Sequence, residues 1–298
     1  MKKLGTLALT LTLAGAMTLP ALAAEDATPV SGTSEDNSSV PMEELVPATV
    51  LPENPYATAL TLNGEALDTA AIPAASDPEL LPMRLVTEAD HGSVYWSETD
   101  NESWFTLGDN RIVVNFADNS VTLNDAALEG VTAEVVSGVT FLPADVLTQL
   151  EGYTVTGEGD ALTITTPNND PMVKTAYQIR EESGMAYGMR SDNAEVATLF
   201  QLPEDTFEQA ICFTSMNTTP DIMVLAKLAD GADEAAVKEA LEAHRQSQHD
   251  TFSWYLSQNL PKVEDARILV EDGYVFYLIA ENADAGEAAF HAYVETQA

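Results

Sequence analysis

Four histidines could in principle bind a metal ion or move protons. They are His91, His244, His249 and His291. Two ligands on one helix face must lie three or four residues apart, whereas His244 and His249, on one predicted helix, lie five apart. The sequence also lacks H-E-x-x-H and C-x-x-C, the spacings typical of zinc sites. We therefore expect no metal ligands among these side chains and no metal cofactor.

Calcium and nucleophilic catalysis receive no better support. No D-x-[DN]-x-[DN]-G loop with its trailing Glu occurs, and the fragment 282–287 is better suited to capping a helix. Neither G-x-S-x-G nor S-x-x-K is present. The single cysteine, Cys212, lies in an apolar run, which favours a small buried side chain over a reactive thiol. The sequence therefore predicts no catalytic residues, no cofactor and no enzyme activity.

Aromatic residues are the remaining candidates for a binding site. Tyr95, Trp104 and Phe105 fall on neighbouring predicted strands, and Trp254 with Tyr255 ends a predicted helix. Exposed aromatic rings can stack on sugars or peptides, whereas core packing is the ordinary alternative. We take Tyr95, Trp104 and Phe105 as the candidate binding surface, on condition that Trp104 is exposed beside Tyr95.

The charge of the chain is strongly negative. Its 298 residues include 48 acidic and 12 basic ones, for a formal net charge of −36. Nucleic-acid binding requires clustered Lys and Arg, so we expect no nucleic-acid partner. The acidic surface is either an adaptation to an extracellular setting or a face that binds a partner. The length suggests about two folded domains.

The N-terminus has the pattern of a secretory signal peptide. Lys2 and Lys3 precede an apolar stretch that ends at Pro20, and small residues at 21–23 suit cleavage after residue 23. No later stretch reaches the roughly 18 apolar residues that a membrane span needs. The acidic, proline-containing stretch 24–55 has too little apolar content to order itself, so we expect a disordered linker. We therefore expect a secreted protein without a membrane span.

Residues 56–166 contain an internal duplication. Leu81-Pro82-Met83-Arg84 and Leu142-Pro143-Ala144-Asp145 are followed about ten residues later by Gly92 and Gly152, and the two prolines lie 61 positions apart. Each unit predicts a short helix that starts near the proline, ends at a left-handed glycine, and packs on a small antiparallel sheet. Predicted strands are 103–107, 112–116, 120–123 and 161–165, with Asp118-Asn119 as a turn.

This duplicated region resembles the copper amine oxidase N-terminal-like domain, also called the stalk domain of bacterial envelope proteins. The resemblance rests on 62–64, 81–84, 94–96, 121–124 and 141–143; the second copy departs from it, with Asp145 at the usual Arg position. It implies a spacer or adhesion role and no copper. We expect Trp96 in the core and Arg84 paired with a carboxylate.

Residues 170–298 predict longer helices around an antiparallel sheet. Asp170 and Pro171 are typical of a helix start, and Asp272-Gly273 is typical of a two-residue hairpin turn. The expected order is helix 171–183, strands 209–215 and 221–228, helix 233–256, strands 266–270 and 274–280, and helix 283–295. The fold class of both domains is therefore α+β. This half resembles a domain of unknown function found in bacterial envelope lipoproteins and secreted proteins.

Three functions remain open from the sequence. We expect first a non-catalytic bacterial envelope protein, associated with the cell wall, in which the two domains bind wall polymer or another envelope protein. The alternatives are a small-ligand or peptide-binding module in residues 170–298, which would need a deep apolar pocket, and a hydrolase with a dispersed site, which would need a buried carboxylate pair or a His–Ser contact.

Overall fold

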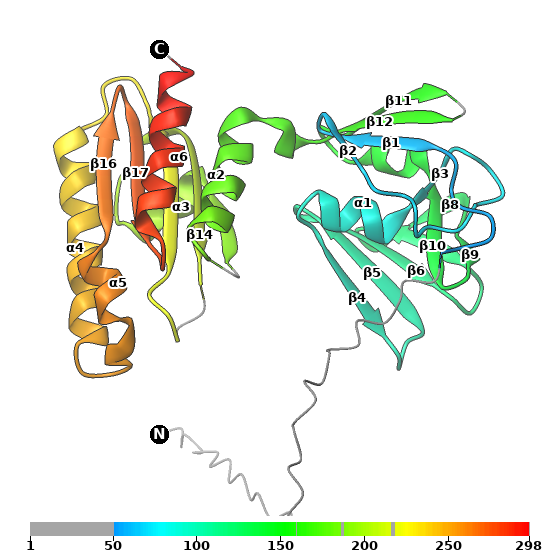
Figure 1. The fold of residues 1–298 in the computed structure, drawn as a ribbon, viewed down its shortest axis with the longest axis horizontal. Coiled ribbons are helices and arrows are strands. Elements are labelled where there is room, and N and C mark those ends of the chain that lie inside the picture. The colour runs from blue at the N-terminus through cyan, green and yellow to red at the C-terminus, as the bar shows by residue number, and fades with distance from the viewer. Residues whose placement is uncertain (1–50, 159, 186–187, 216–217, 298) are drawn as a thin grey trace, which may run out of the picture. The chain divides into compact units, whose positions relative to one another are not determined.

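The computed structural model describes residues 51–158, 160–185, 188–215 and 218–297 (Figure 1). The predicted signal peptide and the linker up to residue 50 lie outside the described residues. The described end of the linker is paired, because Pro55 forms an isolated bridge with Pro73 and the amide of Tyr56 donates to the carbonyl of Ile72 at 2.8 Å. The backbone hydrogen bonds of the first domain therefore begin just before Tyr56.

Three sheets surround the core of the N-terminal region. The five-stranded sheet is an antiparallel meander of β4 (Ser93–Ser97), β5 (Glu102–Leu107), β6 (Asn110–Asn115), β7 (Ser120–Leu123) and β8 (Ala126–Thr132). The second has the order β11 (Thr154–Glu158), β12 (Ala161–Thr165), β1 (Ala59–Leu62), β2 (Glu65–Ala66), with β1 and β12 parallel. The third has the order β3 (Leu80–Pro82), β10 (Val139–Pro143), β9 (Glu134–Val136).

The two copies of the duplication meet in the third sheet. Their Leu-Pro motifs lie on the antiparallel strands β3 and β10, where Leu81 is opposite Leu142. The first motif leads into helix α1 (Met83–Ala89), as expected. The second leads only into the 3-10 helix η1 (Ala144–Gln149), so the two copies differ in helix type.

The end of α1 differs from the expected glycine cap. His91, not Gly92, takes the left-handed conformation, with φ of 61°. Gly92 is needed for space: a Cβ there would lie 2.3 Å from the carbonyl oxygen of Thr106. Gly152 does adopt a positive φ, 79°, as predicted. The glycine of the first copy is therefore a close-approach site between α1 and β5, and the glycine of the second is a turn.

The C-terminal region is a three-layer structure around one antiparallel sheet. The strand order is β13 (Met189–Asp192), β14 (Phe207–Thr214), β15 (Ile222–Leu228), β17 (Tyr274–Ile279), β16 (Arg267–Glu271). Helices α2 (Pro171–Glu182) and α6 (Ala283–Glu295) cover one face, and α3 (Asn193–Leu199), α4 (Glu234–Phe252) and α5 (Leu260–Glu264) cover the other. Alternate residues of the central strands enter each core, so β17 is buried along its whole length.

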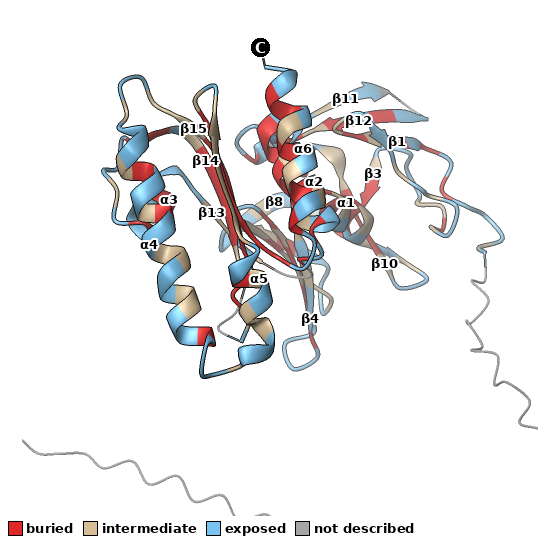
Figure 2. Cartoon of the chain, turned by 60° about the vertical axis from the view of Figure 1, so that its left-hand side comes forward, coloured by how far each residue is buried: buried red, intermediate tan, exposed pale blue. Residues whose placement is uncertain are grey.

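Burial follows this layering (Figure 2). Buried positions gather along β14, β15 and the sheet-facing sides of α2 and α6, whereas α4 buries only Val237, Leu241 and Phe252. The predicted α+β class with antiparallel sheets is confirmed, and so is the N-cap at Asp170. The predicted hairpin turn at Asp272-Gly273 is confirmed as well, and both of its residues have a positive φ. Helices α3 and α5 and strand β13 were not predicted. Among the described residues, no helix is both long and apolar enough to cross a membrane.

Candidate functional site

The outer face of the five-stranded sheet carries an aromatic pair. Tyr95 of β4 is directly opposite Trp104 of β5, and their ring centroids lie 5.2 Å apart with the planes tilted by 52°. The next residue in this row, Val113 of β6, is opposite Trp104. Tyr95 is 58% exposed and Trp104 is half-buried. The structure therefore brings two of the three predicted surface residues together on one outward-facing row, which we call the aromatic face. The condition set for this surface is met only in part, because Tyr95 is exposed and Trp104 only partly so.

Hydrogen bonds and a cation fix the orientation of the Trp104 ring. Its indole N–H donates to a carboxylate oxygen of Glu102 at 3.0 Å, and the other Glu102 oxygen accepts from Asn115 at 3.2 Å. The guanidinium of Arg111 lies 5.3 Å from the ring centroid and pairs with Asp125 at 2.6 Å. A ring held this way loses little further conformational freedom when a ligand stacks on it.

Two aromatic residues are not where the sequence placed them. Phe105 is only 2% exposed, because it points to the opposite, core-facing side of β5, and therefore it cannot belong to the aromatic face. Trp96 was expected in the core but is 46% exposed; it contacts Phe116 at a centroid distance of 5.3 Å, at the end of β4. Strand alternation places Phe105 correctly once Trp104 is known to point outward.

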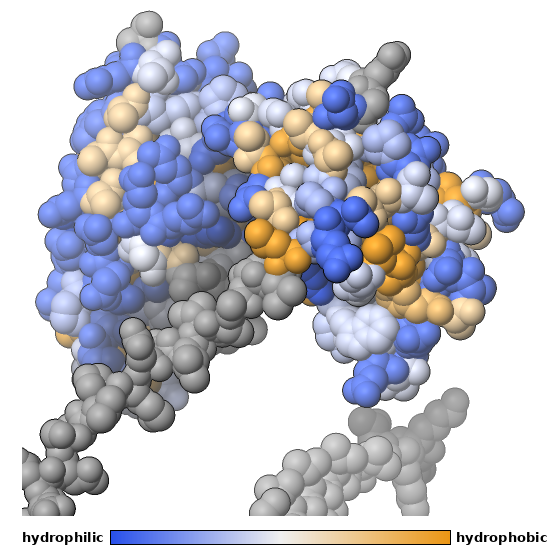
Figure 3. Space-filling model, turned by 45° about the vertical axis from the view of Figure 1, so that its right-hand side comes forward, coloured by the Kyte–Doolittle hydropathy of each residue, from blue (hydrophilic) through white to orange (hydrophobic). Residues whose placement is uncertain are grey.

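A cavity of about 230 Å³ lies on the inner side of the same sheet. Leu85 of α1, Val94 of β4 and Val139 of β10 supply apolar walls, and the half-exposed ion pair of Arg84 with Glu88, at 2.9 Å, lies along α1. The predicted pairing of Arg84 with a carboxylate is therefore confirmed. The cavity is smaller than the roughly 300–1,000 Å³ of drug-sized ligand pockets, so it fits a single side chain. Figure 3 shows hydrophobic patches interrupted by hydrophilic side chains on the face of the N-terminal region that it draws.

Asp90 lies at the centre of a buried polar network in the N-terminal region. The carboxylate of Asp90, 3% exposed, accepts from the hydroxyls of Thr166 at 2.6 Å and Tyr153 at 2.8 Å, and from the amides of Asn63 at 3.3 Å and Asn168 at 3.2 Å. Burial, and then the nearby Asp90 charge, raise the pKa of Tyr153. A carboxylate with four donors is held by the fold and is poorly placed to act as an acid or base.

His244 and Cys212 both lie in packed surroundings within the C-terminal region. The Nδ1 atom of His244 lies 2.9 Å from the Tyr277 hydroxyl, and burial lowers the pKa of this histidine. Cys212 is fully buried, and burial raises the pKa of its thiol to about 12. Among the described residues, no group of three or more His, Cys, Asp or Glu side chains is placed to hold a metal ion.

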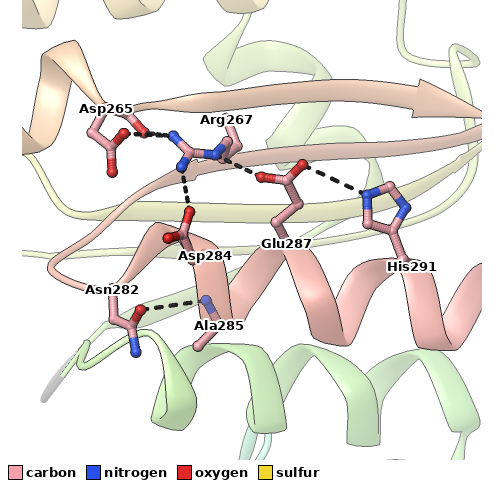
Figure 4. Close-up of polar contacts among 7 residues, drawn as sticks. All are labelled: Asp265, Arg267, Asn282, Asp284, Ala285, Glu287 and His291. Carbon is pink, nitrogen blue, oxygen red and sulfur yellow. Dashed lines mark hydrogen bonds and ion pairs between the residues drawn. The ribbon is translucent and has the colours of Figure 1, made fainter.

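A charged cluster joins β16 to the start of α6 (Figure 4). The guanidinium of Arg267 donates to Glu287 at 2.6 Å, to Asp284 at 2.6 Å and to Asp265 at 2.7 Å. Glu287 also lies 3.6 Å from His291. One guanidinium thus contacts three carboxylates, two of which lie in the first turns of α6, where negative charge is favourable. The cluster explains how the helix is attached to the sheet.

The hollow beside α4 does not match the predicted ligand pocket of the C-terminal region. It is an open hollow lined by Gln246, Ser247, Asp250, Thr251 and Trp254 together with Ala243. Trp254 is 83% exposed at its end. The alternative function of a small-ligand carrier required a deep apolar pocket, and this hollow does not provide one.

Comparison with known families gives two matches. The model of the copper amine oxidase N-terminal domain matches residues 61–166, and that of a domain of unknown function (DUF4358) matches residues 182–280. Both resemblances expected from the sequence are confirmed. No curated protein and no solved structure matches the chain. The copper amine oxidase N-terminal domain is non-catalytic in itself.

Proposed function

We propose that this chain, which carries a copper amine oxidase N-terminal domain followed by a domain of unknown function, is a non-catalytic binding and spacer protein of the bacterial envelope. In this role it is exported, and its N-terminal domain binds wall polymer through the aromatic face. The observation that carries the proposal is the Tyr95–Trp104 pair, because two adjoining rings on a flat, solvent-facing sheet can stack on sugar rings.

The net charge of the chain limits which class of wall polymer it can bind. A chain with a net charge of −36 repels phosphate-rich polymers, and the Arg111 guanidinium beside the aromatic face is already paired with Asp125. The proposed ligand is therefore the uncharged glycan part of the wall, bound by stacking on apolar sugar faces. Such binding should persist at high salt, because it does not depend on ion pairing.

Cosedimentation with purified peptidoglycan tests this proposal. Residues 24–298 should pellet saturably with peptidoglycan at moderate and high salt. Trp104→Ala should weaken pelleting by about tenfold or more, since stacking on an aromatic ring contributes about 1–3 kcal/mol in comparable ring–ring contacts. Trp254→Ala is the matched control, because it removes an even more exposed indole from the other domain.

Two results would contradict the proposal. Absence of pelleting at every salt concentration would show that this face does not bind wall glycan. Equal loss in Trp104→Ala and Trp254→Ala would show that any exposed indole causes the pelleting, and the aromatic face would then have no special role.

A further inference from the structure

Strand β4 is an uncovered edge of the five-stranded sheet. It lies at one end of the strand order and pairs only with β5. Within the described part of the chain, the backbone groups of residues 93–97 form no hydrogen bond outside that ladder. Its residues Tyr95 and Trp96 point to opposite faces and are 58% and 46% exposed. An edge strand of this kind offers unpaired N–H and C=O groups to any extended chain.

Three other edge strands, β8, β13 and β16, carry features that discourage pairing, and β4 does not. Strand β8 has a register shift opposite β7 and carries Glu129, while β13 and β16 each carry charged side chains of both signs. The sequence of β4, Ser-Val-Tyr-Trp-Ser, has neither charge nor proline. Charges, bulges and proline are the usual protection of edge strands, so an edge that lacks all three is suited to pairing.

The cavity described above is lined in part by this edge strand. Val94 of β4 forms part of its wall, and Leu85 and Glu88 of α1 lie across it, so helix and edge strand border one space. A strand that pairs with β4 would direct alternate side chains towards this inner side. A volume of about 230 Å³ accommodates one aliphatic side chain. Pairing through the backbone, with a pocket for one side chain, is a known mode of peptide recognition.

Charge decides which chain fits. Glu98 and Asp100 are exposed in the turn that follows β4. A second copy of this protein would bring another net charge of −36 to the same edge, so self-pairing is opposed. A basic segment would be attracted instead, and its cationic side chains on the outer side would meet the ring of Tyr95.

We propose that β4 is a strand-addition site for an extended segment of a partner protein in which basic residues alternate with small aliphatic ones. The segment pairs with the free edge of β4, places an aliphatic side chain in the cavity between α1 and β10, and directs its basic side chains towards Tyr95 and the carboxylates. The proposal rests on the proposed role of this domain as a binding module, but it does not depend on wall glycan as a ligand.

Fluorescence anisotropy of the full mature chain tests the site. The probe is a fluorescein-labelled peptide of alternating lysine and valine, long enough to cover the five residues of β4. Two controls keep its charge: a peptide with the lysines grouped before the valines, and the alternating peptide with every amide nitrogen methylated. Saturable binding of the alternating peptide is expected, and both controls should bind at least about tenfold more weakly, which corresponds to roughly 1.4 kcal/mol.

Two protein variants locate the site. Val139→Phe fills the cavity and Val94→Lys places an inward-pointing charge on the edge; each should weaken binding about tenfold or more. Far-UV circular dichroism checks that both variants fold. If only one of them folds, that variant alone can locate the site. Trp104→Ala should retain peptide binding, whereas the same variant should pellet more weakly with glycan. A failure of one proposal can therefore be told apart from a failure of the other. Equal affinity for the methylated peptide, no saturable binding, or unchanged binding by a folded Val139→Phe variant would each overturn the proposal.

Discussion

Leu81 and Leu142 lie directly opposite each other on the antiparallel strands β3 and β10, and both are fully buried. They occupy equivalent positions in the two copies of the duplication, one residue before Pro82 and Pro143. The copies thus join at corresponding residues, and the shared core of the N-terminal domain is built around that contact.

The first prediction concerns this contact. Leu81→Ala and Leu142→Ala should each lower the free energy of unfolding by about 2–5 kcal/mol, because each leaves a cavity in the core. The double variant should lose less than the sum, since the two cavities merge. Urea unfolding of the four proteins measures the coupling. Leu51→Ala, which changes a leucine that is 64% exposed, should have almost no effect. Strictly additive losses would show that the two side chains pack independently.

The duplication was visible in the sequence, whereas the way the copies pair was not. Local signals were sufficient for the cap at Asp170 and for the turn at Asp272-Gly273, because a side chain or a positive φ fixes each of them within a few residues. The parallel pairing of β1 with β12 joins residues about 100 positions apart. No local pattern encodes such a contact, so it could not be predicted.

The candidate surface shows the same limit. Tyr95 and Trp104 were predicted to form one surface, and cross-strand pairing brings them together. Phe105 follows Trp104 in sequence, and strand alternation sends it into the core. Trp96 was misplaced for a different reason: it lies on the inner side of β4 but near the strand end, where it remains 46% exposed. Its exposure depends on tertiary packing.

The second prediction concerns Asp90. Asp90→Asn keeps the size of the side chain but replaces one acceptor with a donor that faces the hydroxyl of Tyr153 or Thr166. The variant should unfold about 1–3 kcal/mol more easily, because a buried polar group loses its partner. Thermal unfolding followed by circular dichroism measures the change. Asp109→Asn, at an exposed turn position between β5 and β6, serves as the matched control. A stability equal to that of the control would mean that water satisfies the altered network.

The third prediction concerns the single thiol. Burial raises the pKa of Cys212 to about 12, so its thiol is protonated and inaccessible at neutral pH. Ellman's reagent should therefore react with the unfolded chain in denaturant and hardly at all with the folded protein. Cys212→Ala should remove the signal in both states. Rapid labelling of the folded protein would show that β14 opens locally or that the thiol is reachable.

The fourth prediction concerns pH and His244. Burial lowers the pKa of this histidine in the folded state below its ordinary value of 6.5. The unfolded chain therefore binds the proton first as the pH falls, so protonation costs stability. The loss should begin as the pH drops through about 6.5, the unfolded value, and should stop below the folded value. Its neighbours are the Tyr277 hydroxyl, the Gln248 amide and the Phe200 ring.

His244→Gln provides the test, because glutamine does not titrate and can still bond to Tyr277. Urea unfolding of the wild type and the variant at pH 7.5 and pH 5 would separate this histidine from the many carboxylates, which titrate in both proteins. The wild type should lose more stability than the variant over that interval. An identical loss in the two proteins would mean that His244 takes up its proton as easily in the folded domain as in the unfolded chain. The packing of α4 against β17 would then tolerate the charge.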